Sequence, residues 1–235
     1  MNIPQSQTVS SVHAEKLISD MLGRKMSVTY HKNKHQLLFE EGQVWLAKMY
    51  LPWTVDWADN GRLIEKADSH FSLVLIRAGQ AVTGYFHRGE LIDHKVFRAY
   101  MVRQKQGTSQ IKHLKTKGKS RAGSRIRLAE TARFFEEINE RLNTYSNKYS
   151  IDFWGISCAK TMWPFYFSAE VPPPFTSKEE KLIELPVHIA QASYEELKSV
   201  GKLLQKFHLI FSEKGKEVLE PSNESETEID SVDDW

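Results

Sequence analysis

The chain of 235 residues is long enough for one large domain or two small ones with an apolar core. Hydrophobic residues make up 40% of it and charged residues 26%, which is typical of a globular protein and excludes a fibre or a wholly disordered chain. The net charge is +2, but residues 217–235 hold eight acidic residues and no Lys or Arg, so residues 1–216 carry +10. A basic body with an acidic tail indicates an anionic partner, with nucleic acid the leading candidate.

Cysteine content and hydropathy indicate the cell compartment. Cys158 is the only cysteine, which excludes an intrachain disulfide and a cysteine-based zinc site and fits a reducing cytoplasm. Residues 1–11 are polar and lack the apolar centre of a signal peptide. The longest apolar runs, such as 71–76, are too short to cross a bilayer. We therefore expect a cytoplasmic protein with no membrane partner.

The N-terminal third combines one helix with several strands. Apolar residues recur at helical spacing over 12–23, and Gly23 is a suitable stop. Strand-like runs follow at 28–30, 37–39 and 44–50.

The middle of the chain predicts an antiparallel meander. Residues 71–77, 81–87 and 91–97 are three strand-like runs joined by the turn-prone segments 78–80 and 88–90. A helix is then expected to open at Ser124, because apolar residues recur on one face from there on.

The last third predicts further strands and one more helix. Strands are expected over 151–158, over the aromatic run 163–167 and over 182–187. Ser193 and Glu196 form a capping-box pair that announces the final helix.

These elements suggest three regions and an α/β fold with a mixed sheet, in which helices flank the three-strand meander. We expect a helix- and strand-rich region over 1–69, a domain over 70–211 that contains the meander, and an acidic disordered tail over 212–235.

The most informative segment is 103–127, which contains no acidic residue and is rich in Gly, Ser and Thr. It cannot bury much apolar surface, so we expect a mobile basic loop over 104–123 that binds RNA phosphates. Charge alone leaves a solvated surface loop equally well supported. The cationic residues that we expect to contact RNA are Arg103, Lys105, Lys112, His113, Lys115, Lys117, Lys119, Arg121, Arg125 and Arg127.

A motif within this loop adds specificity. Tyr100, Val102, Arg103 and Lys105 precede the run Gly107-Thr108-Ser109-Gln110, and the run Ser120-Arg121-Ala122-Gly123 follows. This order resembles the release-factor-like domain of the ankyrin-repeat and zinc-finger peptidyl-tRNA hydrolases of ribosome quality control, in a stand-alone bacterial-type form. That family has a Ser-Ala-Gly element, which Arg121 interrupts here.

The resemblance implies a fold similar to the RNase H-like middle domain of eukaryotic and archaeal termination factors. It implies that residues 70–211 form a release-factor-like catalytic domain, which hydrolyses the ester that joins a nascent peptide to tRNA on stalled ribosomes or large subunits. Gln110 would orient the water through its amide, and Gly107 would permit close approach of the backbone. The implied partners are the large ribosomal subunit, ribosomal RNA and peptidyl-tRNA. We expect no cofactor and a monomer away from the ribosome.

Two other functions remain open from the sequence. The protein is alternatively an endonuclease that cuts tRNA near its 3′ end, with the basic residues or His113 active. It is alternatively a non-catalytic factor that binds the ribosome or RNA through the same loop.

Other candidate residues are better explained by packing. His87 and His94 are expected on adjacent strands, with Asp93 beside His94, but they form no ligand-spaced cluster, so we predict no metal site. Cys158 is expected to be a buried small side chain. The aromatic residues Trp53, Trp57, Trp154, Trp163 and Phe165 are expected in the core more often than on a base-stacking surface.

Overall fold

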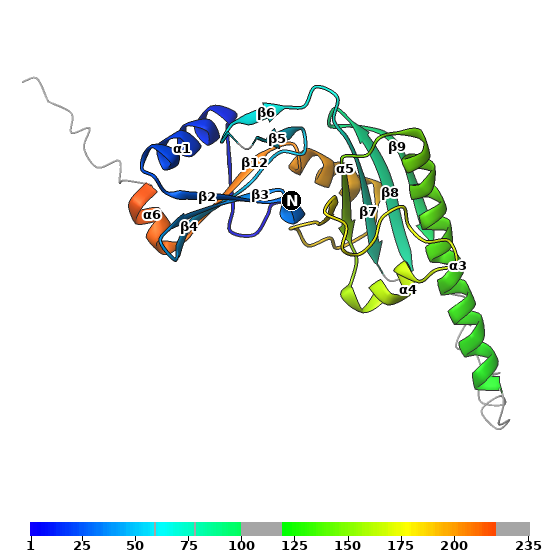
Figure 1. Ribbon diagram of the computed structural model, residues 1–235. Helices are drawn as coiled ribbons and strands as arrows, with labels where there is room; N and C mark the ends of the chain where they lie inside the picture. The colour runs from blue at the N-terminus through cyan, green and yellow to red at the C-terminus, as the bar shows by residue number, and fades with distance from the viewer. Residues whose placement is uncertain (59, 78, 100–118, 220–235) are drawn as a thin grey trace, which may run out of the picture.

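The computed structural model describes residues 1–58, 60–77, 79–99 and 119–219, and for 119–130 the backbone alone. Its strands form two five-stranded sheets that lie side by side, with a short β5–β6 ribbon beside them (Figure 1). The elements in chain order are β1 (Gln7–Val9), α1 (Ser11–Gly23), β2 (Ser27–His31), the 3-10 turn η1 (Lys32–Lys34), β3 (Gln36–Glu41), β4 (Val44–Tyr50), β5 (Val55–Trp57), β6 (Leu63–Glu65), β7 (His70–Arg77), β8 (Gln80–His87), β9 (Glu90–Arg98), α3 (Lys119–Lys148), β10 (Phe153–Ser157), the 3-10 turn η2 (Lys160–Met162), α4 (Trp163–Phe167), β11 (Leu182–Glu184), α5 (Tyr194–Leu203), β12 (Phe207–Phe211) and α6 (Glu213–Leu219).

The first sheet is antiparallel throughout and has the strand order β1-β12-β4-β3-β2. The helix α1 buries Ala14, Leu17, Ile18 and Met21, which share a core with apolar residues of β3, β4 and β12. Ser10 caps α1, because its side chain accepts a hydrogen bond from the backbone N–H of His13 at 3.2 Å. The first sheet thus joins the N-terminal strands to a strand from the C-terminal end of the chain.

The second sheet is mixed and has the order β11-β10-β7-β8-β9. Strand β10 runs parallel to both of its neighbours, whereas β7, β8 and β9 form the predicted antiparallel meander. Alternate residues of the central strands point to opposite faces, and each face has its own core. The helix α5 contributes to one core and α3 to the other. The prediction of an α/β protein with a mixed sheet, whose meander is flanked by helices, is therefore confirmed.

The turn between β8 and β9 shows how local sequence fixes the register of the meander. Arg88 and Gly89 are its two central residues, and both have positive φ angles, of 53° and 81°. This is the backbone that a two-residue hairpin prefers because its twist matches that of the strands. The φ angle of Gly89 favours glycine, because L side chains rarely adopt this backbone conformation.

Aromatic side chains join the two sheets. The backbone N–H of Trp53, which follows β4, donates to the carbonyl oxygen of Leu204 at 2.8 Å. The Trp53 ring meets Phe71 of β7 edge to face, with centroids 5.3 Å apart, and it also contacts Phe153 of β10. His35 also contacts Phe153, with ring centroids 4.6 Å apart. The core of the second sheet therefore includes residues from the N-terminal part of the chain.

Some predicted elements differ from the structure. The aromatic run 163–167 is not a strand but the short helix α4, because Pro164 at the start suits the first helical turn, where no donor is needed. The helix predicted to open at Ser124 begins at Lys119 and continues through Gly123, a residue that costs a helix only about 1 kcal/mol. Strand β11 ends at Glu184, before Pro186.

The C-terminal end also departs from the sequence prediction. Disorder was expected from Ser212 onward, but 213–219 form α6, which packs against β4 and β12. Gly215 makes this packing possible, because a Cβ atom there would lie 1.9 Å from the carbonyl oxygen of Leu46. Residues 220–235, the remainder of the predicted tail, lie outside the described residues. In the part of the chain that the structure describes, no helix combines the length and apolar character needed to span a membrane.

Candidate functional site

The predicted catalytic pair, Gly107 and Gln110, lies outside the described residues. So do six of the predicted RNA-binding residues, namely Arg103, Lys105, Lys112, His113, Lys115 and Lys117. The other four lie in the first turns of α3, where only the backbone is described; they are Lys119, Arg121, Arg125 and Arg127. What the structure describes is the frame that carries this segment.

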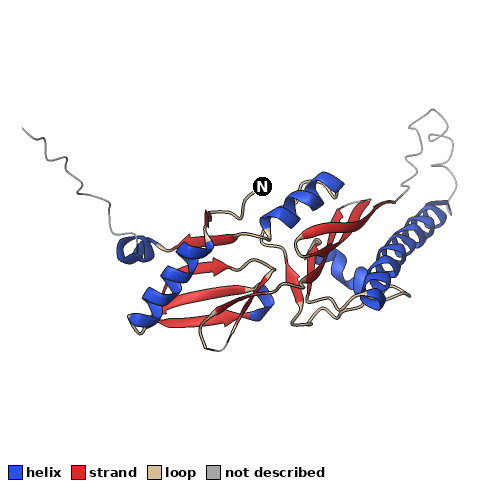
Figure 2. Ribbon diagram, turned by 90° about the horizontal axis from the view of Figure 1, so that it is seen from above, coloured by secondary structure: helices blue, strands red, loops and turns tan. Residues whose placement is uncertain are grey.

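Strand β9 and helix α3 form that frame (Figure 2). The backbone N–H of Ala99 donates to the carbonyl oxygen of Gly79 at 2.9 Å, which ties the end of β9 to the β7–β8 turn. The 30 residues of α3 correspond to a length of about 45 Å, whereas the nine residues of β9 extend over about 30 Å. The first turns of α3 therefore project past the sheet, and they do so at the end where β9 terminates (Figure 1).

The second half of α3 is held firmly against the sheet. Phe135, Ile138, Leu142 and Tyr145 are almost completely buried in the core that α3 shares with β7 and β8. On the side of α4, the amide nitrogen of Asn139 donates to the carbonyl oxygens of Tyr166 and Val171, at 3.3 and 2.8 Å. A helix fixed in this way is a rigid support for the turns that project.

One polar cluster fixes α3 to β9. The Nη2 atom of Arg141 lies 2.5 Å from the Oδ2 atom of Asp93, and the Nε atom donates to the Tyr145 hydroxyl at 3.2 Å. Burial raises the pKa of Tyr145, so the hydroxyl stays protonated at neutral pH. Asp93, which the sequence placed beside a candidate histidine, is therefore a partner of the supporting helix.

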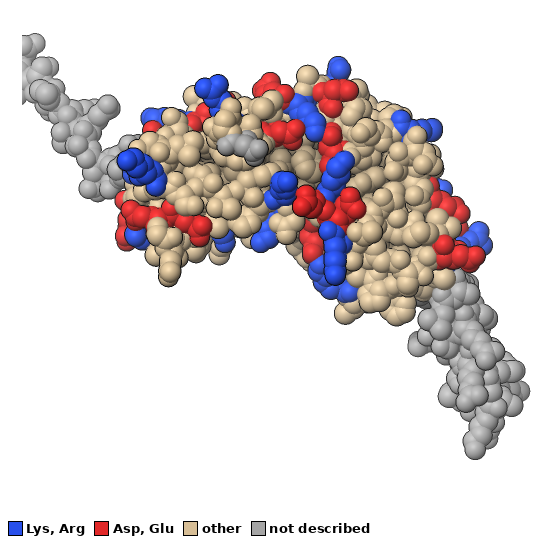
Figure 3. Space-filling model, viewed as in Figure 1, with Lys and Arg blue, Asp and Glu red and all other residues tan. Residues whose placement is uncertain are grey.

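The start of α3 is electrostatically suited to an anion. Its first turn contains no acidic residue, although acidic residues are the ones that stabilise a helix N-terminus. The partial positive charge of the helix end adds to the charges that the sequence supplies at Lys119 and Arg121. In contrast, acidic and basic side chains are interspersed over the face of the body shown in Figure 3. The unbalanced positive charge is thus a property of the segment around residues 103–127.

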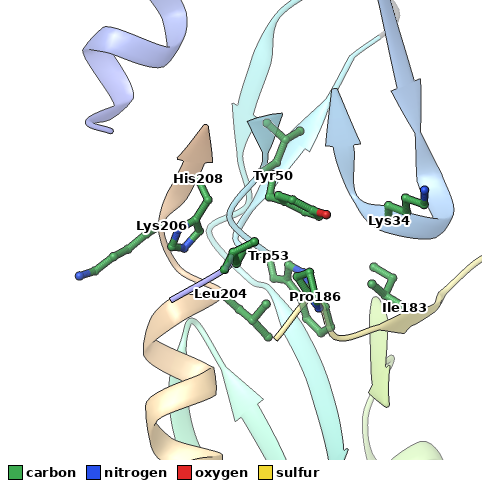
Figure 4. Close-up of a pocket in the computed structure, with 10 residues that line it drawn as sticks. Lys34, Tyr50, Trp53, Ile183, Pro186, Leu204, Lys206 and His208 are labelled. Atoms are coloured by element: carbon green, nitrogen blue, oxygen red, sulfur yellow. The ribbon is translucent and has the colours of Figure 1, made fainter. Parts of the chain in front are cut away.

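The pockets of the described residues lie elsewhere. The one in Figure 4 lies where the two sheets meet, lined by Tyr50, Trp53, Leu204 and their neighbours. Its volume of about 10 Å³ leaves room for about one water molecule, which is too small for a substrate. A larger open groove of about 750 Å³ lies between η1 and the segment 177–186, and Lys32 and Glu180 form an ion pair across it at 3.8 Å. Neither includes β9 or α3.

His87 and His94 lie on the adjacent strands β8 and β9, as expected, but they are not opposite each other. His94 lies opposite Gly84 on β8 and packs on Tyr194, with ring centroids 4.6 Å apart. His87 of β8 lies opposite His70 of the neighbouring strand β7, and both of these rings approach the carboxylate of Asp68. Sequence reasoning missed Asp68 and His70, because their only signal is a common D-x-H spacing.

The remaining candidate residues lie mostly in the cores. Cys158 is only partly buried, which departs from the expected buried side chain, and it packs against the core under α3. Burial raises the pKa of its thiol to about 11, so it is no thiolate nucleophile at neutral pH. Trp53 and Trp154 are buried, as expected. Phe165 on α4 is 57% exposed and departs from that expectation.

The frame can now be compared with known proteins. A sequence model described as "Bacteroidetes VLRF1 release factor" matches residues 71–211, which include α3, the segment between β9 and α3, and all of the second sheet except His70. The match defines the class as release-factor-like. Since it covers more than half of the chain, the protein belongs to the Bacteroidetes VLRF1 release factor family, and the resemblance to release-factor-like proteins inferred from the sequence is confirmed.

No curated protein matches the chain significantly. Among solved structures, the "Vms1 mitochondrial localization core" aligns with a TM-score of 0.40 and 10% sequence identity, over 87% of this chain and 85% of that one.

Proposed function

We propose that this protein is a ribosome-associated peptidyl-tRNA hydrolase that frees nascent chains on stalled ribosomes or large subunits in the cytoplasm. The observation that carries the proposal is the family match, which spans the segment with Gly107 and Gln110. The partners are the large subunit, ribosomal RNA and peptidyl-tRNA.

The chemistry asks little of the side chains. Water attacks the ester carbonyl carbon, the bond to the ribose oxygen of the terminal adenosine breaks, and that oxygen takes up a proton. An ester needs a positioned water and a stabilised oxyanion rather than a strong base. The neutral amide of Gln110 both donates and accepts hydrogen bonds, so it suits the positioning of that water. The cationic residues around it hold the segment on RNA phosphates.

The described frame supports this role. A loop that enters the ribosome must be presented away from the body, and the projecting start of α3 carries one of its two ends there. The core under α3 and the ion pair between Arg141 and Asp93 keep that helix fixed on the sheet. The partial positive charge at the start of α3 attracts an anionic surface, and no acidic residue in the first turn offsets it.

The test measures peptide release from large subunits that carry peptidyl-tRNA. Gln110→Ala should slow release by about 10²–10³-fold, the usual cost of losing one positioned hydrogen-bonding group in a transition state. Gln106→Ala is the matched control, because it removes the same side chain four residues earlier and outside the motif. Equal release by wild type and Gln110→Ala overturns the catalytic role of Gln110.

The two alternatives give different outcomes in the same assay. Sequencing of the released tRNA shows an intact 3′ end after ester hydrolysis and a shortened one after endonuclease cleavage. A non-catalytic factor binds the subunit in a salt-dependent manner and releases no peptide under any condition.

A further inference from the structure

A compact cluster of two histidines and one aspartate lies at one end of the meander. His70 is the first residue of β7 and His87 the last of β8, and the register places them directly opposite each other. Their rings stack with centroids 4.6 Å apart and planes 8° from parallel. The Nε2 atoms of His70 and His87 lie 3.3 and 2.7 Å from the two carboxylate oxygens of Asp68, so three potential ligand atoms converge within 4.8 Å of one another.

The surroundings fix the orientation of His70. Its Nδ1 atom lies 2.7 Å from the Tyr85 hydroxyl, which leaves Nε2 directed at Asp68. Its backbone N–H donates to Asp152 at 2.7 Å, and the second oxygen of Asp152 accepts from Lys66 at 2.7 Å. Metal-binding histidines are usually held in this way, with the second ring nitrogen hydrogen-bonded to a neighbouring group.

We propose that Asp68, His70 and His87 form a binding site for a divalent transition-metal ion of the zinc class. Two imidazole nitrogens and one carboxylate oxygen are a typical three-ligand set for such an ion. Ligands of a tetrahedral zinc site, with bonds of about 2.0–2.1 Å, lie about 3.3 Å apart. The Nε2 atom of His70 lies 3.3 Å from Oδ2 of Asp68, the Nε2 atom of His87 lies 2.7 Å from Oδ1, and all the candidate ligand atoms lie within 4.8 Å of one another. Side-chain rotations of about 1–1.5 Å would bring these separations to the tetrahedral value.

The cluster is accessible enough to load an ion. The side chains of His70 and His87 are 19% and 32% exposed, and that of Asp68 is 68% exposed, so the fourth coordination position faces solvent. A metal ion would take the place of the hydrogen bond between the Nε2 atom of His87 and Asp68. Arg88 lies 3.7 Å from the same carboxylate and is the cation with which the metal competes.

The position of the site suggests its role. Asp68 belongs to the segment that connects β6 to the second sheet, and His70 and His87 belong to the sheet itself. The site lies at the opposite end of the meander from Arg98, about 25 Å away along β9. A bound ion would therefore clamp the connecting segment onto the sheet and stabilise the fold, without taking part in peptide release.

Metal binding to the full-length protein, freed of metal with a chelator, tests the proposal. Titration with Co²⁺, followed by its visible absorption, and with Zn²⁺, in competition with a chromophoric chelator, should show one site per chain. His87→Gln and Asp68→Asn should each weaken binding by more than about 100-fold, beyond the 10–100-fold cost of losing an outer partner. Tyr85→Phe should fall in the 10–100-fold range.

The matched control is His94→Gln, which removes a histidine from the neighbouring strand but outside the cluster. It should bind the metal as the wild type does, and Arg88→Ala should bind more tightly. Circular dichroism establishes that each variant is folded. Absence of a stoichiometric site in the wild type, or unchanged binding in folded His87→Gln, overturns the proposal.

Discussion

The two sheets have the same number of strands but differ in their connections. The first is antiparallel and contains β12, a strand from near the end of the described chain, between β1 and β4. The second is mixed, has a core on each face and leads through β9 into the segment with Gly107 and Gln110. The segment with Gly107 and Gln110 thus follows the edge strand of the sheet whose central strands are buried on both faces.

The comparison also shows that the sheets depend on each other. The family match ends at residue 211 and so includes β12, yet β12 forms its hydrogen bonds with β1 and β4, which lie outside the match. In return, Ile3 and Trp53 contribute to the core under α5. We expect the two sheets to unfold as one cooperative unit.

The largest expected effect tests this coupling through β12. Leu209→Ala should lower the free energy of unfolding by about 2–5 kcal/mol, because the side chain is only 1% exposed and leaves a cavity. Chemical denaturation should still show one transition. The control Val44→Ala, at a partly exposed position of the same sheet, should change stability by about 0.5 kcal/mol or less. Two separate transitions, one for each sheet, would contradict the coupling.

The second effect concerns His35, where the sheets meet. Burial lowers its pKa to about 4; the ring donates from Nε2 to the carbonyl of Pro52 and accepts at Nδ1 from the Tyr30 hydroxyl. The unfolded chain therefore binds the proton first, so this contribution to stability is complete above about pH 6.5 and is lost as the pH falls towards 4. The loss amounts to roughly 3 kcal/mol. Denaturation of His35→Gln from pH 7 to pH 4 should show a correspondingly weaker dependence than the wild type.

The smallest effect contrasts two helical glycines. A Cβ atom on Gly201 of α5 would lie 2.2 Å from the Phe86 ring, so Gly201→Ala should cost about 1–3 kcal/mol despite the better helix propensity of alanine. Gly23, at the end of α1, has nothing within 4 Å of such an atom, so Gly23→Ala should stabilise by about 0.5–1 kcal/mol. Thermal unfolding of both variants measures the difference. A stabilising Gly201→Ala would show that Phe86 can move aside.

Much of the fold could be predicted from local sequence patterns. The three strand-like runs over 71–97 and the turn-prone segments between them predicted the meander. The Ser193–Glu196 pair predicted the start of α5, where the Ser193 hydroxyl accepts from the backbone N–H of Glu196 at 3.2 Å. The run 163–167 was misassigned because strands and short helices share aromatic residues, and Pro164 decided the outcome. Helix α6 was missed because its stability comes from packing on β4.

The sequence by itself determined the charge segregation, the meander and the membership in a release-factor family, because these depend on residue order within short windows. The roles of Gly107 and Gln110 remain proposals from that same order. Only the tertiary structure decided that β12 completes the first sheet, that Trp53 and His35 join the two sheets, and that Asp68, His70 and His87 meet. The physical reason lies in how strands pair. The residue pattern of one strand determines which of its side chains share a face, but it does not determine which strand pairs with it or in what register.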